Sequence, residues 1–131
     1  MNKNIKQIYP RKKVISALTI AICLIFCLLS VRGQDPKISE LKKFYQTTCV
    51  KCHGPDGSAV GEDGKKLKGQ DFTDRQWQQD TKDEEMVKII HKGKFFGLAM
   101  PAFNDKLSDE EIQLIVTDII RKAEKGKTIA P

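Results

Sequence analysis

Histidine and cysteine are scarce in this chain, which has two histidines and four cysteines among 131 residues. Cys23 and Cys27 lie in an apolar N-terminal stretch, so only Cys49 and Cys52 remain for the rest of the chain. A structural zinc site needs about four cysteine or histidine ligands. Cys49 and Cys52 could supply half of such a site. The second half is missing, because the two histidines are His53, which directly follows Cys52, and a single distant one, His91.

Excess charge is also missing once the first 33 residues are set apart. The chain has a formal net charge of +6, but six of its 23 basic residues and none of its 17 acidic residues precede residue 34. Residues 34–131 are therefore formally neutral. This balance removes the bulk electrostatic argument for a nucleic-acid partner, which needs a basic surface.

A strand-helix-strand pattern is absent around the cysteine pair, which argues against a thioredoxin-like dithiol site. At 131 residues, the chain has room for one small domain. The apolar core of such a domain is modest, and a large apolar group bound inside it would supply the missing volume.

The first 33 residues have the form of an export signal. Residues 1–13 are polar and basic, and an apolar run covers residues 14–31. The run is long for a signal peptide and just long enough to span a bilayer, so a signal cleaved before Gln34 and an uncleaved membrane anchor both stay open. Either arrangement places residues 34–131 outside the cytoplasmic membrane, because the basic end stays inside. We expect a periplasmic or exported domain, soluble after cleavage or tethered through residues 14–31.

The stretch Cys49-Val50-Lys51-Cys52-His53 is the most informative part of the sequence. On a helix, positions three apart share a face, so Cys49 and Cys52 present two thiols side by side and His53 follows at once. Thiols add to the vinyl groups of a haem, and a neutral imidazole is a strong nitrogen ligand for iron. The pattern Cys-x-x-Cys-His is typical of c-type haem attachment. We expect Cys49 and Cys52 to hold one haem and His53 to bind its iron.

Capping signals predict a helix that ends at this motif. Asp35 is the expected N-cap, and Pro36 suits the first helical position. Apolar residues then recur at helical spacing up to Cys49. The turn-forming residues 54–57 end the helix, which therefore carries the cysteines to the haem.

A capping box of Thr81 and Glu84 predicts a middle helix, and Gly93 predicts its end. Met86 belongs to the apolar stripe of this helix, so we expect it in the core rather than on the iron. His91 lies off that stripe and is expected in solvent.

The last helix has the clearest signals. Ser108 and Glu111 form a second capping box. A long apolar stripe follows at helical spacing, and Gly126 predicts the end of the helix.

Two segments between the helices are predicted to be loops. Residues 58–80 show no apolar periodicity, and Phe72 and Trp77 are expected to anchor this loop. Trp77 either packs in the haem pocket or donates a hydrogen bond to a haem propionate. The second loop holds Met100, which Pro101 restricts to an extended geometry suited to directing its thioether toward a metal.

The order of these parts resembles the class I cytochromes c, above all the short exported bacterial ones. The resemblance covers residues 35–125 and rests on the haem motif, the Met100-Pro101-Ala102-Phe103 loop and the capped last helix. It implies an all-α fold of three main helices, with loops wrapped around one covalently bound haem c. It also implies that His53 and Met100 are the axial ligands of the iron. Trp77, Pro101 and Phe103 would then pack in the haem pocket.

The chain departs from the pattern of this family in two places. Leu41 stands where many members have a small residue, and Ile119 stands where they have an aromatic one. We hypothesise that these changes compensate, because the larger and the smaller side chain keep the volume at the helix crossing similar. Gln70 replaces a proline common after Gly69, which leaves open which carbonyl accepts the Nδ1–H of His53.

Two axial ligands leave the iron no open position, so we expect a one-electron carrier and not an enzyme. Its redox partners would be a donor and an acceptor protein, such as an oxidase, a reductase or a dehydrogenase. The alternative is a haem enzyme or gas-binding sensor with a labile sixth ligand. Lys51, Lys92 and Lys94 either surround an exposed haem edge and contact these partners or only solvate the surface.

Overall fold

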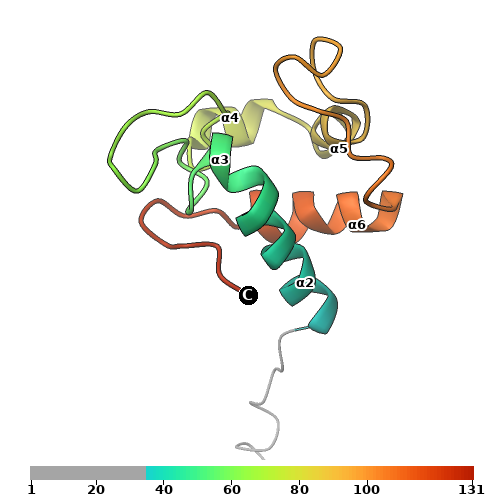
Figure 1. Cartoon of the computed structure of the whole chain (residues 1–131), viewed down its shortest axis with the longest axis horizontal. Coiled ribbons are helices and arrows are strands. Elements are labelled where there is room, and N and C mark those ends of the chain that lie inside the picture. The colour runs from blue at the N-terminus through green and yellow to red at the C-terminus, as the bar shows by residue number, and fades with distance from the viewer. Residues whose placement is uncertain (1–34) are drawn as a thin grey trace, which may run out of the picture. The chain divides into compact units, whose positions relative to one another are not determined.

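The computed structural model describes residues 35–131, and the predicted leader, residues 1–33, lies outside the described residues. Residues 34–131 form one compact unit. Every regular element in residues 35–131 is helical, as predicted (Figure 1). The remaining backbone pairing in this part consists of two isolated β-bridges. None of the helices in this part is long and apolar enough to cross a membrane.

Three consecutive helical segments form the predicted first helix: α2 (Pro36–Phe44), η1 (Tyr45–Cys49) and α3 (Val50–His53). The carboxylate of Asp35 accepts a hydrogen bond from the Lys37 amide at 2.9 Å, which confirms the predicted N-cap. Gly54, with a φ of +79°, ends α3 as predicted. The π-helical turn η1 ends at Cys49, the first residue of the haem motif, and such turns are frequent at functional sites.

The predicted loop over residues 58–80 was wrong at its C-terminal end, where α4 (Arg75–Asp80) forms. Asp74 caps this short helix by accepting hydrogen bonds from the amides of Gln76 and Trp77. Periodicity missed α4 because six residues are too few to show a stripe. Its one sequence signal was the N-cap aspartate.

The middle helix is α5 (Asp83–Lys92), and its N-cap is Lys82, whose side chain makes no capping hydrogen bond. The predicted capping box of Thr81 and Glu84 was therefore wrong. Thr81 instead follows α4 as its C-cap. The predicted end at Gly93 is confirmed. Met86 is buried as predicted, whereas Nε2 of His91 lies 3.3 Å from a carboxylate oxygen of Asp109.

The last helix consists of α6 (Asp109–Leu114) and η2 (Ile115–Ile120). Its start confirms the predicted capping box, because Ser108 and Glu111 exchange side-chain to backbone hydrogen bonds. Its end was predicted too late, since Arg121 is already the C-cap and Gly126 lies in the following turn.

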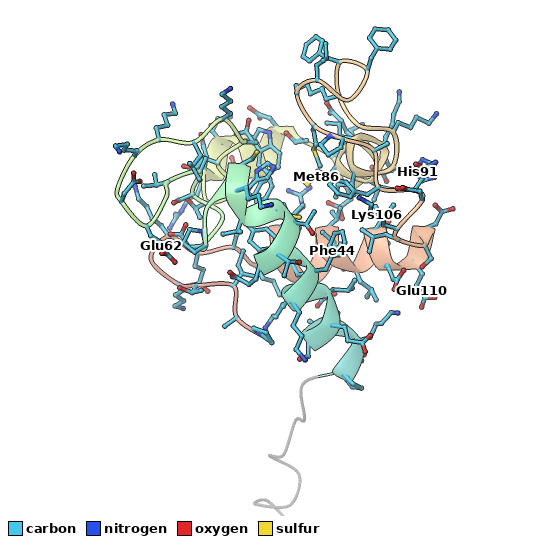
Figure 2. All side chains as sticks on the ribbon, viewed as in Figure 1. Phe44, Glu62, Met86, His91, Lys106 and Glu110 are labelled. Atoms are coloured by element: carbon cyan, nitrogen blue, oxygen red, sulfur yellow. The ribbon has the colours of Figure 1, made fainter. Side chains whose placement is uncertain are left out.

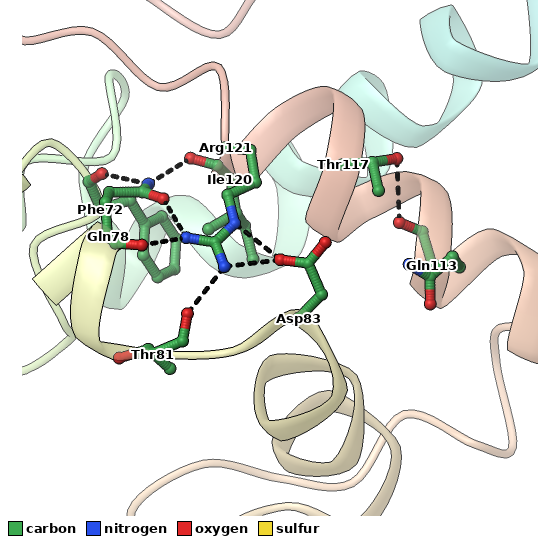
Figure 3. A network of polar contacts seen from close by, with 8 residues as sticks. All are labelled: Phe72, Gln78, Thr81, Asp83, Gln113, Thr117, Ile120 and Arg121. Carbon is green, nitrogen blue, oxygen red and sulfur yellow. Dashed lines mark hydrogen bonds and ion pairs between the residues drawn. The ribbon is translucent and has the colours of Figure 1, made fainter.

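Arg121, the C-cap residue of η2, joins this end of the helix to other segments. Its guanidinium contacts Asp83 at 2.7 Å, the side-chain oxygen of Gln78 at 2.7 Å and the carbonyl of Thr81 at 2.7 Å (Figure 3). Gln78 in turn donates to the carbonyls of Phe72 and Ile120. This network joins the end of η2 to α4 and to the start of α5.

The core lies among α2, η1, α5, α6 and η2. It contains 13 buried apolar residues, among them Leu41, Met86 and Ile119. The side chains of Phe44 and Met86 point to the interior, whereas His91 and Glu110 lie at the outer edge (Figure 2). Since residues 35–131 contain this core, we expect them to fold without the leader.

Candidate functional site

A cavity of about 490 Å³ opens between the first helix, α5 and the loop after α5. Its volume falls within the range of about 300–1,000 Å³ common for cofactor pockets. The cavity brings together every site residue predicted from the sequence, and these are Cys49, Cys52, His53, Trp77, Met100, Pro101 and Phe103. Three of these residues lie in the first helix and one, Trp77, lies in α4. The other three lie in the loop before α6.

Cys49 and Cys52 are both free thiols at the wall of the cavity, the first partly buried and the second exposed. Burial raises the pKa of the Cys49 thiol to about 12, and the neighbouring Cys52 adds to this rise. Residues 35–131 contain no group of three or more histidine, cysteine or acidic side chains arranged to hold a metal ion. The raised pKa keeps the Cys49 sulfur in its protonated thiol form at neutral pH.

The imidazole of His53 is held at Nδ1 by the carbonyl oxygen of Gln70, at a distance of 3.0 Å. This contact leaves Nε2 as the free ring nitrogen, and an outer hydrogen bond of this kind normally fixes the orientation of a ligating histidine. Burial lowers the pKa of His53 despite this hydrogen bond, which favours the neutral, ligating form. The carbonyl that the sequence left open is therefore that of Gln70.

Gly69 brings this carbonyl close to the haem motif. Its amide donates to the carbonyl of Cys52 at 2.8 Å. A Cβ atom at this position would lie 2.3 Å from the Cys52 oxygen and 2.7 Å from Nδ1 of His53. Only glycine therefore fits here without displacing the motif.

One face of the His53 ring is covered by Phe72. The two rings are stacked, with centroids 4.3 Å apart and planes 16° apart. The indole ring of Trp77 lies beside the same phenyl ring, with the two centroids 5.6 Å apart. Phe72 thus supports the His53 ring, and Trp77 supports Phe72. The sequence predicted that Phe72 and Trp77 anchor the loop but did not predict the stacking on His53.

The Met100 loop is closed at its base by two residues. The amide of Lys94 donates to the carbonyl of Met100 at 2.9 Å. Gly93, with a φ of +74°, lies so close that a Cβ atom would be 2.6 Å from the same carbonyl. These contacts fix the main chain of Met100 at the cavity, where its partly buried side chain packs against the core.

Exposed lysines surround part of the cavity mouth. Lys51 and Lys94, which the sequence singled out, line the cavity, whereas Lys92 does not. Lys68 also lines it and was missed, because it lies in a loop whose path the sequence does not define.

The residues present fit a covalently held haem. A largely apolar cavity of suitable volume carries two adjacent thiols, an oriented imidazole and a thioether on its wall. Within a helical fold, this combination defines a c-type cytochrome.

Comparisons with known proteins agree. Residues 36–117 match the family described as Cytochrome C oxidase, cbb3-type, subunit III. Cytochrome c6 of Leptolyngbya boryana is 36% identical over 86 residues, which cover 64% of this chain and 91% of that protein. Cytochrome c6 of Thermostichus vulcanus is 31% identical over 116 residues, which cover 88% and 96%. The solved structure of the KustC0563 c-type cytochrome has a TM-score of 0.51 and 34% identity, and the match covers 64% of this chain and 96% of that one.

The chain therefore belongs to the c-type cytochromes. It carries covalently bound haem c and functions in electron transfer, and its fold is the all-α fold of the class I members.

Proposed function

We propose that this protein is a single-haem electron carrier that works outside the cytoplasmic membrane and is not an enzyme. Cys49 and Cys52 hold the haem by thioether bonds, and His53 and Met100 are its axial ligands. Trp77, Pro101 and Phe103 pack against it. The bound haem supplies an iron that takes up and returns one electron.

One observation carries the proposal: Cys49, Cys52 and His53 of the haem motif line a single cavity with Met100, although Met100 lies 47 positions after His53 in the chain. His53 is oriented by the carbonyl of Gln70, and Met100 is positioned by the closed base of its loop. With both axial positions filled, substrates have no access to the metal. A thioether ligand also favours the reduced state relative to a second nitrogen ligand.

An optical spectrum tests the ligand assignment. The purified holoprotein should show a low-spin, six-coordinate spectrum with the weak long-wavelength band of a sulfur-to-iron bond. Met100→Ala should abolish this band. Met86→Leu is the matched control, because Met86 lines the same cavity and should leave the band in place.

Carbon monoxide tests the alternative function. Rapid binding of carbon monoxide to the reduced wild-type protein would contradict the carrier and favour a haem enzyme or gas-binding sensor. Cys49→Ala with Cys52→Ala should release the haem on acid-acetone extraction, whereas the wild-type protein should keep it.

The proposal also covers the leader and the redox partners. Residues 1–33 act as a signal peptide or as an N-terminal anchor, and residues 34–131 form the cytochrome domain. The domain exchanges electrons with a donor and an acceptor protein. Mass spectrometry of the native protein would report both the N-terminus and the added haem. A mass that corresponds to Gln34 at the N-terminus would support cleavage, and a full-length mass would support the anchor.

A further inference from the structure

The loop between α5 and α6 carries three large apolar side chains that stand in solvent. The exposed fractions are 69% for Phe95, 106% for Phe96 and 92% for Leu98. Within residues 35–131, these are the large hydrophobic side chains that are exposed. We call these three residues the apolar tip. The three side chains lie outside the hydrophobic core, and exposed apolar clusters are typical of binding surfaces.

The backbone holds the apolar tip in an unusual conformation. Phe95, Phe96 and Gly97 have consecutive φ values of 51°, 53° and 85°. Left-handed geometry is unfavourable for bulky residues, and such strain persists where the surrounding structure enforces it. Here the amide of Leu98 bonds the carbonyl of Phe95 at 3.1 Å, and the amide of Ala99 bonds the carbonyl of Lys94 at 3.3 Å. The loop is therefore a closed turn whose geometry keeps the apolar side chains in solvent.

The chain around the apolar tip is basic. Residues 88–106 contain four lysines and one aspartate, a net charge of +3, although residues 34–131 as a whole are neutral. Lys92 and Lys94 directly precede the tip, and both are exposed. This charge favours an anionic partner next to the apolar contact.

The loop is also convex. It projects beyond the helices at the top of the view, where it is drawn in orange (Figure 1). A rigid protein partner would need a matching hollow for this projection. A lipid bilayer accepts it anywhere on its surface, because aromatic and leucine side chains enter the interface and lysines bind anionic headgroups.

We propose that the apolar tip inserts into the interface of an anionic phospholipid bilayer, with Lys92 and Lys94 against the headgroups. Phe95 and Lys94 also line the cavity, so this contact brings the cavity mouth toward the membrane surface. The proposal is independent of the electron-carrier role, since vesicle binding requires no electron transfer.

Sedimentation with large unilamellar vesicles tests the proposal. The processed holoprotein, residues 34–131, is mixed with vesicles of phosphatidylglycerol and phosphatidylethanolamine or of phosphatidylcholine alone. Haem absorbance in the pellet gives the partition coefficient. The wild-type protein should bind the anionic vesicles and bind the zwitterionic ones at least about tenfold more weakly.

Polar variants of the tip should lose this binding. Phe96→Asn with Leu98→Ser should lower the partition coefficient at least about tenfold. Asparagine is chosen because it tolerates left-handed geometry, so the loop should keep its shape. Phe96→Tyr with Leu98→Met should retain most of the binding. Unchanged thermal unfolding and haem spectra would show that these exposed positions do not affect the fold.

Two lysine pairs separate the basic contact from general charge. Lys92→Gln with Lys94→Gln should weaken binding to anionic vesicles, and this binding should fall as salt rises. Lys65→Gln with Lys66→Gln is the matched control, because these exposed lysines lie in a different loop. It should change binding less than about twofold.

Three results would overturn the proposal. The first is wild-type protein that stays in the supernatant with anionic vesicles, which would point to a protein partner. The second is a Phe96→Asn, Leu98→Ser variant that binds as well as wild type. The third is a lipid-free dimer that this variant abolishes, which would assign the tip to self-association.

Discussion

The Nδ1 atom of His53 lies 3.0 Å from the carbonyl oxygen of Gln70, 17 residues along the chain. Because the acceptor belongs to the main chain, the path of the backbone at Gly69 and Gln70 sets the orientation of the ring, and the side chain of Gln70 does not. The hydrogen bond therefore depends on the close approach of Gly69 to Cys52.

Gly69→Ala should break this approach. Its Cβ atom would lie 2.3 Å from the Cys52 oxygen, so the loop or the motif must move. We expect the free energy of unfolding to fall by about 2–4 kcal/mol, with a changed haem spectrum. Denaturant unfolding and optical spectra of the holoprotein measure both effects.

Two variants serve as controls for Gly69→Ala. Gly64→Ala meets no atom within 4 Å and should cost only its left-handed backbone penalty, about 1–2 kcal/mol. Gln70→Pro retains the acceptor carbonyl and should keep the wild-type spectrum. The explanation fails if Gly69→Ala is as mild as Gly64→Ala and spectrally silent.

Gly93 has a similar role for Met100. The φ angles of Gly93 and Gly97 are +74° and +85°, so alanine at either position carries a similar backbone penalty. Only at Gly93 would the new Cβ atom collide with the carbonyl of Met100, at 2.6 Å. Gly93→Ala should therefore weaken the sulfur-to-iron band and allow carbon monoxide to bind, whereas Gly97→Ala should do neither. Equal spectra for the two variants would contradict this role.

The sequence predicted the parts of the fold that local chemistry defines. The Asp35 cap, the Ser108–Glu111 capping box and the glycine at the end of α5 each involve residues close in sequence, so short patterns indicate them. The haem motif was identified for the same reason. Met100 was singled out as a candidate ligand because Pro101 marks a loop that cannot be helical, and the structure places it in the lining of the same cavity.

The sequence could not predict contacts between distant segments. Arg121, the C-cap of η2, bonds Asp83 and the carbonyl of Thr81, about 40 residues away in the chain. The stacking of Phe72 on His53 and the position of Lys68 at the cavity depend on the path of a glycine-rich loop. The apolar periodicity of a sequence carries no information on such contacts between distant segments.

The contact between the first and last helices should depend on pH. Lys37 and Glu111 form an ion pair at 2.6 Å, and the pKa of Glu111 is lowered to about 2, first by the hydrogen bond from Lys37 and then by Ser108. A lowered folded-state pKa stabilises the protein above the ordinary value of 4.5, and this stabilisation is lost as the pH falls toward 2.

Glu111→Gln should remove this pH-dependent part. The difference in unfolding free energy between wild type and variant should be present at neutral pH and shrink as the pH falls below 4.5. Urea unfolding over this range measures it, with Lys37→Gln as the partner variant. A difference that is constant with pH would show that the carboxylate is not involved.

The helix crossing offers a test of compensation between Leu41 and Ile119. Both are buried, with 3% and 2% of their surfaces exposed, in the core that α2 shares with η2. In a double-mutant cycle of Leu41→Gly and Ile119→Tyr, we expect the double variant to be more stable than the sum of the single losses by about 0.5 kcal/mol or more. Additive losses would mean that the two positions do not interact.

The lysines at the cavity mouth should govern electron transfer to an acidic partner. Lys51, Lys68 and Lys94 line the cavity, so their charges lie at its edge, whereas Lys92 does not line it. If docking is electrostatic, the bimolecular electron-transfer rate should fall as salt rises. Lys51→Gln with Lys68→Gln should lower the rate at low salt and flatten its salt dependence, while Lys65→Gln, in another loop, should change it little. Stopped-flow kinetics measure these rates. A wild-type rate that is independent of salt would remove the lysines from docking and leave them as solvating groups.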